Sequence, residues 1–136
     1  MGFPLDQALI DAAVALANHR YPQGEAVVAA LRTASGKVLT SVSAEARVDA
    51  ACLCAETGAI CEAHKINEAV VASVCLYRQS AADPLQVLPA CGICQERLAF
   101  WGLDVEVAVP DTRPGHFWQS RTLRELRPFY WDEPGS

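Results

Sequence analysis

Three cysteines and one glutamate have the types and the spacing of a metal site with a proton carrier beside it. Cys54 is followed two positions later by Glu56, and Cys91 and Cys94 form a Cys-x-x-Cys pair further along the chain. Three thiolates leave one position of a tetrahedral Zn²⁺ ion open for water. A carboxylate close to that water can move protons. The spacing therefore predicts a catalytic Zn²⁺ site with Cys54, Cys91 and Cys94 as ligands and Glu56 as the acid-base residue.

Other interpretations of these cysteines stay open at this point. A Cys-x-x-Cys pair also occurs in redox sites, in structural zinc sites and in apolar cores. A structural four-cysteine site would need Cys52 or Cys61 as its fourth ligand. Cys52 lies on the wrong side of the expected helix start, and Cys61 lies two turns along that helix. A zinc-stabilised binding protein without turnover is a further alternative, although such a protein needs no Glu56 beside an open metal position.

The elements expected around these residues alternate between helices and strands. Cys54 lies near the start of one predicted helix and Cys91 opens another, and helix N-termini favour thiolate over thiol. The predicted helices span residues 5–18, 51–64, 91–100 and 120–126, the last capped by Ser120, and the predicted strands span residues 26–33, 37–43, 69–77 and 105–109. This order predicts one α/β domain over residues 1–136, with a mixed central sheet in a three-layer α/β/α arrangement.

The composition limits the class of partner. The 136 residues are 51% hydrophobic and 20% charged, with a formal net charge of −5. An acidic chain lacks the basic track that a long polynucleotide requires, so we expect a small-molecule ligand and no nucleic acid polymer. No stretch is long and apolar enough for a bilayer, and the first residues lack a signal-peptide pattern. With six cysteines, this favours a reducing cytoplasmic location, and the apolar composition favours a homo-oligomer.

With its Cys-Ala-Glu and Cys-x-x-Cys motifs, the sequence resembles the zinc-dependent cytidine deaminase superfamily. The similarity is to the small free-nucleoside branch, which includes blasticidin S deaminases and has Cys at the first ligand, whereas polynucleotide-editing branches usually have His. The segments Val27–Leu31, Gly36–Val38 and Leu123–Pro128 also resemble the family. The resemblance implies a cytidine deaminase-like fold, a Zn²⁺ cofactor, a homotetramer and a role in pyrimidine salvage.

The resemblance also implies a reaction, the hydrolytic deamination of a cytidine-type nucleoside to the uridine form with release of ammonia. Zinc hydroxide would attack C4 of the pyrimidine, while Glu56 carries protons to N3 and to the leaving amino group. Backbone groups at Ala55 and Ala90 would orient the base, and Glu45 would bind the ribose 3′-hydroxyl.

Several positions depart from the family pattern and bear on the substrate. Ser43 replaces an Asn that helps to bind the sugar, and Glu25 replaces a Phe that packs against the substrate. Phe129 and Trp131, in the aromatic C-terminal segment, are candidates to line the pocket of this subunit or of a neighbour. These differences keep a modified cytidine or a cytosine-nucleoside antibiotic such as blasticidin S open as the substrate.

The surroundings of the predicted metal differ from the family as well. Thr57 and Gln95 stand where the family often has Arg, which offsets the net charge of −1 carried by three thiolates and Zn²⁺. Arg97 could offset this charge instead, or it could be an ordinary surface residue. Ala90 replaces a Pro, which bears on the backbone carbonyl facing the amino group.

Overall fold

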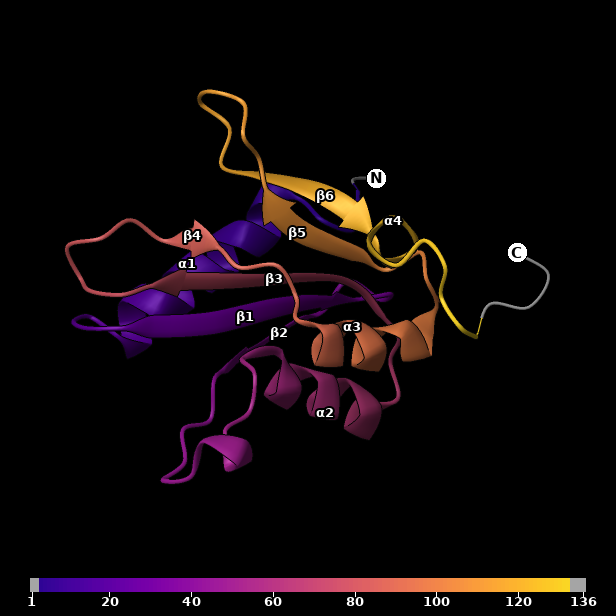
Figure 1. Ribbon diagram of the computed structural model, residues 1–136, viewed down its shortest axis with the longest axis horizontal. Helices are drawn as coiled ribbons and strands as arrows, with labels where there is room; N and C mark the ends of the chain where they lie inside the picture. The colour runs from indigo at the N-terminus through magenta and orange to yellow at the C-terminus, as the bar shows by residue number, and fades with distance from the viewer. Residues whose placement is uncertain (1–2, 133–136) are drawn as a thin grey trace.

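A six-stranded mixed sheet forms the centre of the computed structural model, which describes residues 3–132 (Figure 1). The strands follow the order β2-β1-β3-β5-β6, and β4 pairs with β3 outside this path. The pairs β1–β2, β1–β3 and β5–β6 are antiparallel, whereas β3–β5 is parallel. The strands are β1 Ala26–Thr33, β2 Val38–Val42, β3 Val70–Arg78, β4 Gln86–Val87, β5 Glu106–Pro110 and β6 Trp118–Thr122.

Helices cover both faces of this sheet. Helix α1 (Gln7–Arg20) packs on one face, and α2 (Glu56–Ile66) and α3 (Gly92–Leu98) lie side by side on the other (Figure 1). A short α4 (Leu123–Leu126) follows β6, and two 3₁₀ turns span Asp49–Ala51 and Ala99–Trp101. The predicted three-layer α/β/α arrangement with a mixed sheet is confirmed. Within residues 3–132, no helix is long and apolar enough to cross a bilayer.

Strand β3 is the central strand, and its side chains enter both cores. Val74 and Leu76 pack with the buried face of α1, whereas Cys75 packs with α2 and α3. A strand covered on both faces is expected to be a continuous apolar run, which is the pattern of this segment. The run therefore predicts the central strand, and β3 carries Cys75 to the layer that holds the cysteine motifs.

The predicted helix over residues 51–64 begins later than its pattern indicates. Leu53 pairs with Ala44 in an isolated β-bridge, and their backbone groups exchange two hydrogen bonds of 2.9 and 3.1 Å. This pairing holds the chain extended just before the helix, so α2 begins at Glu56. Cys54 consequently lies in the turn that leads into α2 and not inside the helix.

The predicted helix over residues 120–126 is wrong in its first half. The segment Trp118–Thr122 forms β6 and pairs with β5, so Ser120 is a strand residue and caps no helix. Thr122 is the N-cap of α4, where its hydroxyl accepts from the Glu125 N–H at 3.2 Å and the Glu125 carboxylate accepts from the Thr122 N–H at 2.9 Å. Pairing with a neighbouring strand overrides the local helical pattern here.

Candidate metal and active site

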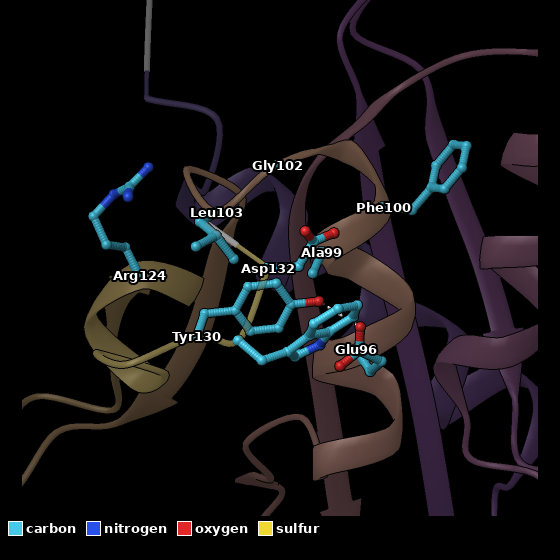
Figure 2. Close-up of a pocket in the computed structure, with 9 residues that line it drawn as sticks. Glu96, Ala99, Phe100, Gly102, Leu103, Arg124, Tyr130 and Asp132 are labelled. Atoms are coloured by element: carbon cyan, nitrogen blue, oxygen red, sulfur yellow. Dashed lines mark hydrogen bonds between the residues drawn. The ribbon is translucent and has the colours of Figure 1, made fainter. Parts of the chain in front are cut away.

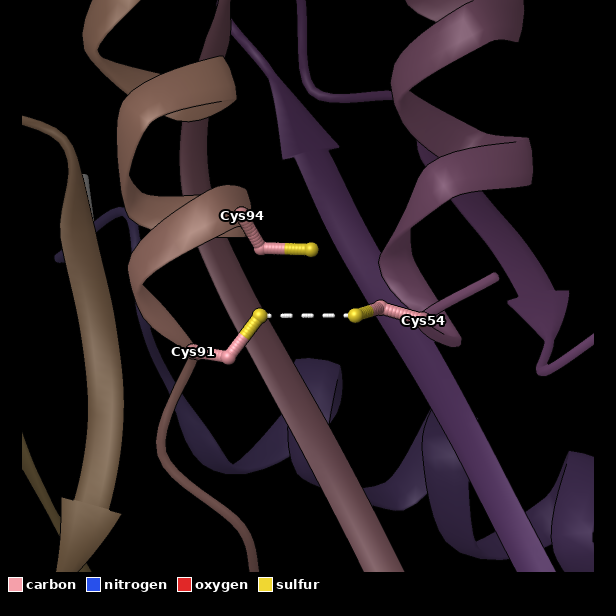
Figure 3. Close-up of side chains that lie close together, drawn as sticks. All are labelled: Cys54, Cys91 and Cys94. Atoms are coloured by element: carbon pink, nitrogen blue, oxygen red, sulfur yellow. Dashed lines mark hydrogen bonds between the residues drawn. The ribbon is translucent and has the colours of Figure 1, made fainter. Parts of the chain in front are cut away.

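Three thiols converge where the chain enters α2 and α3 (Figure 3). Cys54 lies just before α2, Cys91 is the N-cap of α3, and Cys94 belongs to the first turn of α3. The Sγ atoms of Cys54 and Cys91 are 3.3 Å apart, and all three Sγ atoms lie within 4.8 Å of one another. Sulfur atoms on one tetrahedral Zn²⁺ ion, each about 2.3 Å from it, lie about 3.8 Å apart. The cluster therefore fits a zinc ion.

No fourth Cys, His, Asp or Glu joins this group in the described part of the chain. The Cys52 thiol faces the backbone carbonyls of Ala46 and Val48, at 3.8 and 4.0 Å. Cys61 is exposed on α2. These two residues are thus not arranged as the fourth ligand of a structural four-cysteine site.

The three thiols differ in their electrostatic surroundings. Burial raises the pKa of the Cys54 and Cys94 thiols. Partial burial acts in the same direction on Cys91, but hydrogen bonds from the Cys94 N–H, the Cys54 side chain and the Ile93 N–H outweigh it and lower the pKa of Cys91. Donors at the start of a helix favour the thiolate. A bound cation favours the thiolate at all three positions, because a coordinating thiol loses its proton.

Glu56 is buried beside the cluster as the first residue of α2. Its side chain is 3% exposed, and this burial raises the pKa of the carboxyl group. Hydrogen bonds from its own backbone N–H and from the Cys94 thiol, together with the charge of Arg97, act in the opposite direction. A carboxyl group with a raised pKa exchanges protons more readily near neutral pH. Glu56 thus has the placement of a proton carrier next to the thiols.

A cavity of about 190 Å³ opens beside the thiols and Glu56. Sites for drug-sized ligands typically measure about 300–1,000 Å³, so this cavity suits a small ring. The residues that line it come from five separate segments: Val27, Ser43, Cys54, Ala55, Glu56, Cys75, Leu88, Pro89 and Cys91. Most of these side chains are apolar, and Glu56 supplies the carboxylate.

Only some of the residues predicted to contact the base and the sugar lie at this cavity. Ser43 and Ala55 line it. Ala90 is buried next to Pro89, and its carbonyl accepts a hydrogen bond of 2.8 Å from the Gln95 side chain. Glu45 and Glu25 are exposed and do not line the cavity. The roles of Ala90, Glu45 and Glu25 stay predictions.

The aromatic C-terminal segment lies elsewhere in this chain. Trp131 and Tyr130 border a separate surface hollow of about 500 Å³ against α3, where the Tyr130 hydroxyl donates to Glu96 (Figure 2). Phe129 is 97% exposed and Trp131 is 77% exposed. Neither side chain lines the cavity beside the thiols of its own chain. Lining the pocket of a neighbouring subunit therefore stays as the prediction for these two residues.

Four residues that line the cavity are not predicted from the sequence motifs. For Leu88 and Pro89 the only local signal is that they closely precede Cys91. Val27 and Cys75 come from β1 and β3, and only the pairing of these strands places both residues at the cavity. Cys75 is buried, and it also forms part of the cavity wall.

Arg97 lies beside Thr57 and close enough to Glu56 for its charge to act on that carboxyl group. Its Nη1 donates to the Thr57 hydroxyl at 2.8 Å, and its charge partly opposes the rise in the pKa of Glu56 that burial causes. We expect Arg97→Met to lower the zinc affinity and the rate of ammonia release about tenfold or more, in the range typical of residues that support metal ligands. Competition with a chelator and an ammonia assay measure the two effects.

The control for this variant is Arg113→Met, which removes a cation that pairs with Asp111 on an exposed loop. Arg113→Met should leave the zinc affinity and the rate of ammonia release unchanged. If Arg97→Met matched Arg113→Met in both measurements, Arg97 would be only a surface residue. Arg97→Lys should retain most of the zinc affinity, because it keeps the charge.

Solved structures similar to this chain are cytidine deaminases. The enzyme from Bacillus anthracis is 39% identical, with a TM-score of 0.86 over 92% of this chain and 88% of that chain. The enzymes from Mycobacterium leprae and Burkholderia pseudomallei are 24% and 23% identical, with TM-scores of 0.71 and 0.70, and share the fold over 90% and 92% of this chain and 96% and 98% of theirs. Comparisons with protein families and with curated proteins find no match.

The mixed sheet, the helices on both of its faces and the cluster of three thiols define a chain of the deaminase type. Given its similarity to the Bacillus anthracis enzyme over most of both chains, this chain belongs to the cytidine deaminase superfamily. The resemblance inferred from the cysteine motifs is thereby confirmed. The thiol cluster and these structural neighbours also fit zinc-dependent deamination.

Proposed function

We propose that this protein is a zinc-dependent enzyme that converts a cytidine-type nucleoside and water into the uridine form and ammonia. The observation that carries the proposal is the buried Glu56 carboxyl group beside three thiols that lie within 4.8 Å of one another. A purely structural zinc site has no use for a buried acid at its open side. Burying an ionisable carboxyl group costs free energy of folding. Groups that transfer protons are often buried despite this cost, because burial shifts their pKa towards the working pH.

Different residues of the chain have different roles in the proposed reaction. Cys54, Cys91 and Cys94 would hold Zn²⁺, which when bound acts as a Lewis acid and lowers the pKa of water towards neutrality. Glu56 accepts the proton of the attacking water and donates it to N3 of the pyrimidine. It then carries the second proton to the amino group at C4, which leaves as ammonia. The apolar side chains of Val27 and Leu88 keep bulk water away from this exchange.

A free nucleoside is the substrate class that the chain supports best. The net charge of −5 disfavours a polynucleotide, and the cavity of about 190 Å³ has room for a single small ring. The structural neighbours are described as cytidine deaminases. We place the sugar near Ser43 and Glu45, at the end of β2, and the base against Ala55 and Ala90.

We further propose a cytoplasmic homotetramer with a role in pyrimidine salvage. Large apolar residues stay exposed, including Leu53, next to Cys54, at 44%, Ile93 on α3 at 61%, and Phe100 in the 3₁₀ turn after α3 at 71%. Apolar surface of this kind commonly packs against another subunit. The aromatic residues Phe129 and Trp131 would contact a neighbouring subunit in such an assembly.

A modified cytidine or a cytosine-nucleoside antibiotic such as blasticidin S is the second candidate substrate. The observation that favours it is Ser43, whose short side chain lines the cavity where the family has the longer Asn. The carbonyl of Ala90 is already bonded by Gln95. Both differences change how the sugar and the exocyclic amino group are held.

A screen for ammonia release tests the proposal. Zinc-loaded protein should release ammonia from at least one of cytidine, deoxycytidine, N4- or 5-substituted cytidines, cytosine and blasticidin S, and protein stripped of metal should release none. Single-stranded oligonucleotides should give no product. Strong activity on an oligonucleotide would contradict the charge argument, and no activity on any of these compounds would contradict the proposed function.

A further inference from the structure

Ser41, on β2, is bonded to the backbone of the first turn of α2. Its hydroxyl donates to the Ala55 carbonyl at 2.5 Å and accepts from the Ala59 N–H at 3.0 Å. In an α-helix the N–H of a residue bonds the carbonyl four positions earlier, so Ala59 and Ala55 are the first such pair of α2. The Ser41 side chain, which comes from the sheet, therefore forms hydrogen bonds with both members of this pair.

Gly58 permits this close approach between the strand and the helix. A Cβ atom at position 58 would lie 2.9 Å from the Cβ of Ser41, well inside the usual distance of about 3.5–4.0 Å between non-bonded carbons. Glycine in a helix costs stability relative to alanine. At the same end of the helix, the N-cap residue Ala55 makes no side-chain capping bond. Ser41 thus adds, from the sheet, a side-chain contact to the first turn of a helix whose own N-cap residue makes none.

The peptide group held by Ser41 is the one that leads into Glu56. The carbonyl of Ala55 and the N–H of Glu56 belong to one planar unit. The other end of that unit is the Cα atom of Glu56, whose side chain lines the cavity. Because the unit is rigid, a hydrogen bond to its carbonyl restricts the position of the Glu56 Cα atom and the direction in which the side chain leaves the backbone.

We propose that Ser41 is a positioning residue whose hydroxyl, admitted by Gly58, holds the Ala55–Glu56 peptide and so aims the Glu56 carboxylate into the cavity. Ser41 is not among the residues that line that cavity. The proposal rests on the proposed function, because it assigns how the proton carrier of that same site is oriented. An acid-base group held in one direction works without first being reoriented.

The first test compares Ser41→Ala with Thr40→Val in zinc-loaded protein. Thr40 is the exposed neighbour of Ser41 on β2, so Thr40→Val removes a hydroxyl from the same strand on its other side. Ser41→Ala should lower kcat about 10- to 100-fold, as is typical for residues that support an active site, with KM changed less than about threefold. Zinc content should stay at the wild-type value. Thr40→Val should match the wild type.

Amide hydrogen exchange supplies a readout that does not depend on turnover. The Ala59 amide should exchange faster in Ser41→Ala, because one of its bonding partners is lost, and should be unchanged in Thr40→Val. Gly58→Ala, which separates the same two elements, should also lower kcat. The double variant should lose little more than the worse single variant, since both changes break one contact.

Different outcomes overturn different claims. If Ser41→Ala kept a wild-type kcat while its Ala59 amide exchanged faster, Ser41 would support the helix but not the carboxylate. Loss of zinc from Ser41→Ala would show that the hydroxyl supports Cys54 instead, and fully additive losses with Gly58→Ala would show two separate effects. If the wild type released no ammonia from any compound of the screen, the proposed function would fail first, whereas the exchange measurement would still report on the contact.

Discussion

Glu56→Gln is expected to abolish ammonia release while leaving zinc bound. Glutamine has nearly the same shape as glutamate, but it cannot accept the proton of the attacking water. Removing a general acid-base group typically costs about 10²–10⁴-fold in rate, and Glu56 would serve in both proton transfers. The measurement is ammonia release with the best compound of the screen, together with the zinc content of the same sample.

A matched control is Glu62→Gln, which makes the same chemical change on the exposed side of α2. This variant should keep full activity. Because burial raises the pKa of Glu56, the neutral amide should not lower the melting temperature of the protein. Turnover that survived Glu56→Gln would contradict the mechanism. Loss of zinc from the variant would make Glu56 a ligand and not a proton carrier.

Cys91→Ser is expected to remove zinc and activity together. Cys91 is the thiol whose pKa is lowered, and a hydroxyl in its place is a much poorer zinc ligand. After dialysis against a moderate chelator, the variant should hold almost no zinc, whereas the wild type should hold it in stoichiometric amount. Ammonia release should disappear with the metal.

Thermal unfolding tests the same site without any substrate. A ligand present at about a thousand times its dissociation constant stabilises the folded state by about 4 kcal/mol, so a strong chelator should lower the melting temperature of the wild type. It should leave Cys91→Ser unchanged. Cys61→Ser, which alters an exposed thiol on α2, should behave as the wild type does. A chelator response retained in Cys91→Ser would show that the metal is bound elsewhere.

The local patterns of the chain were sufficient to predict the class of fold and the family. The apolar run at residues 69–77 predicts the central strand β3, because a strand covered on both faces has no polar side. The Cys-x-x-Cys spacing brings Cys91 and Cys94 to one turn of α3, and Cys54 with Glu56 marks the start of α2. Ligand types and short spacings are properties of neighbouring residues, so the sequence carries them directly.

Contacts between distant segments were decided by the tertiary structure alone. Pairing with β5 makes residues 120–122 part of a strand where the local pattern favours a helix. The convergence of Cys54 with Cys91, and the contact of Ser41 with the first turn of α2, depend on how α2 and α3 pack on the sheet. A single sequence does not contain these distances, because they result from the burial of many apolar side chains at once. The motifs thus determined which residues could do the chemistry, and the packing of the sheet and helices determined how they are aimed.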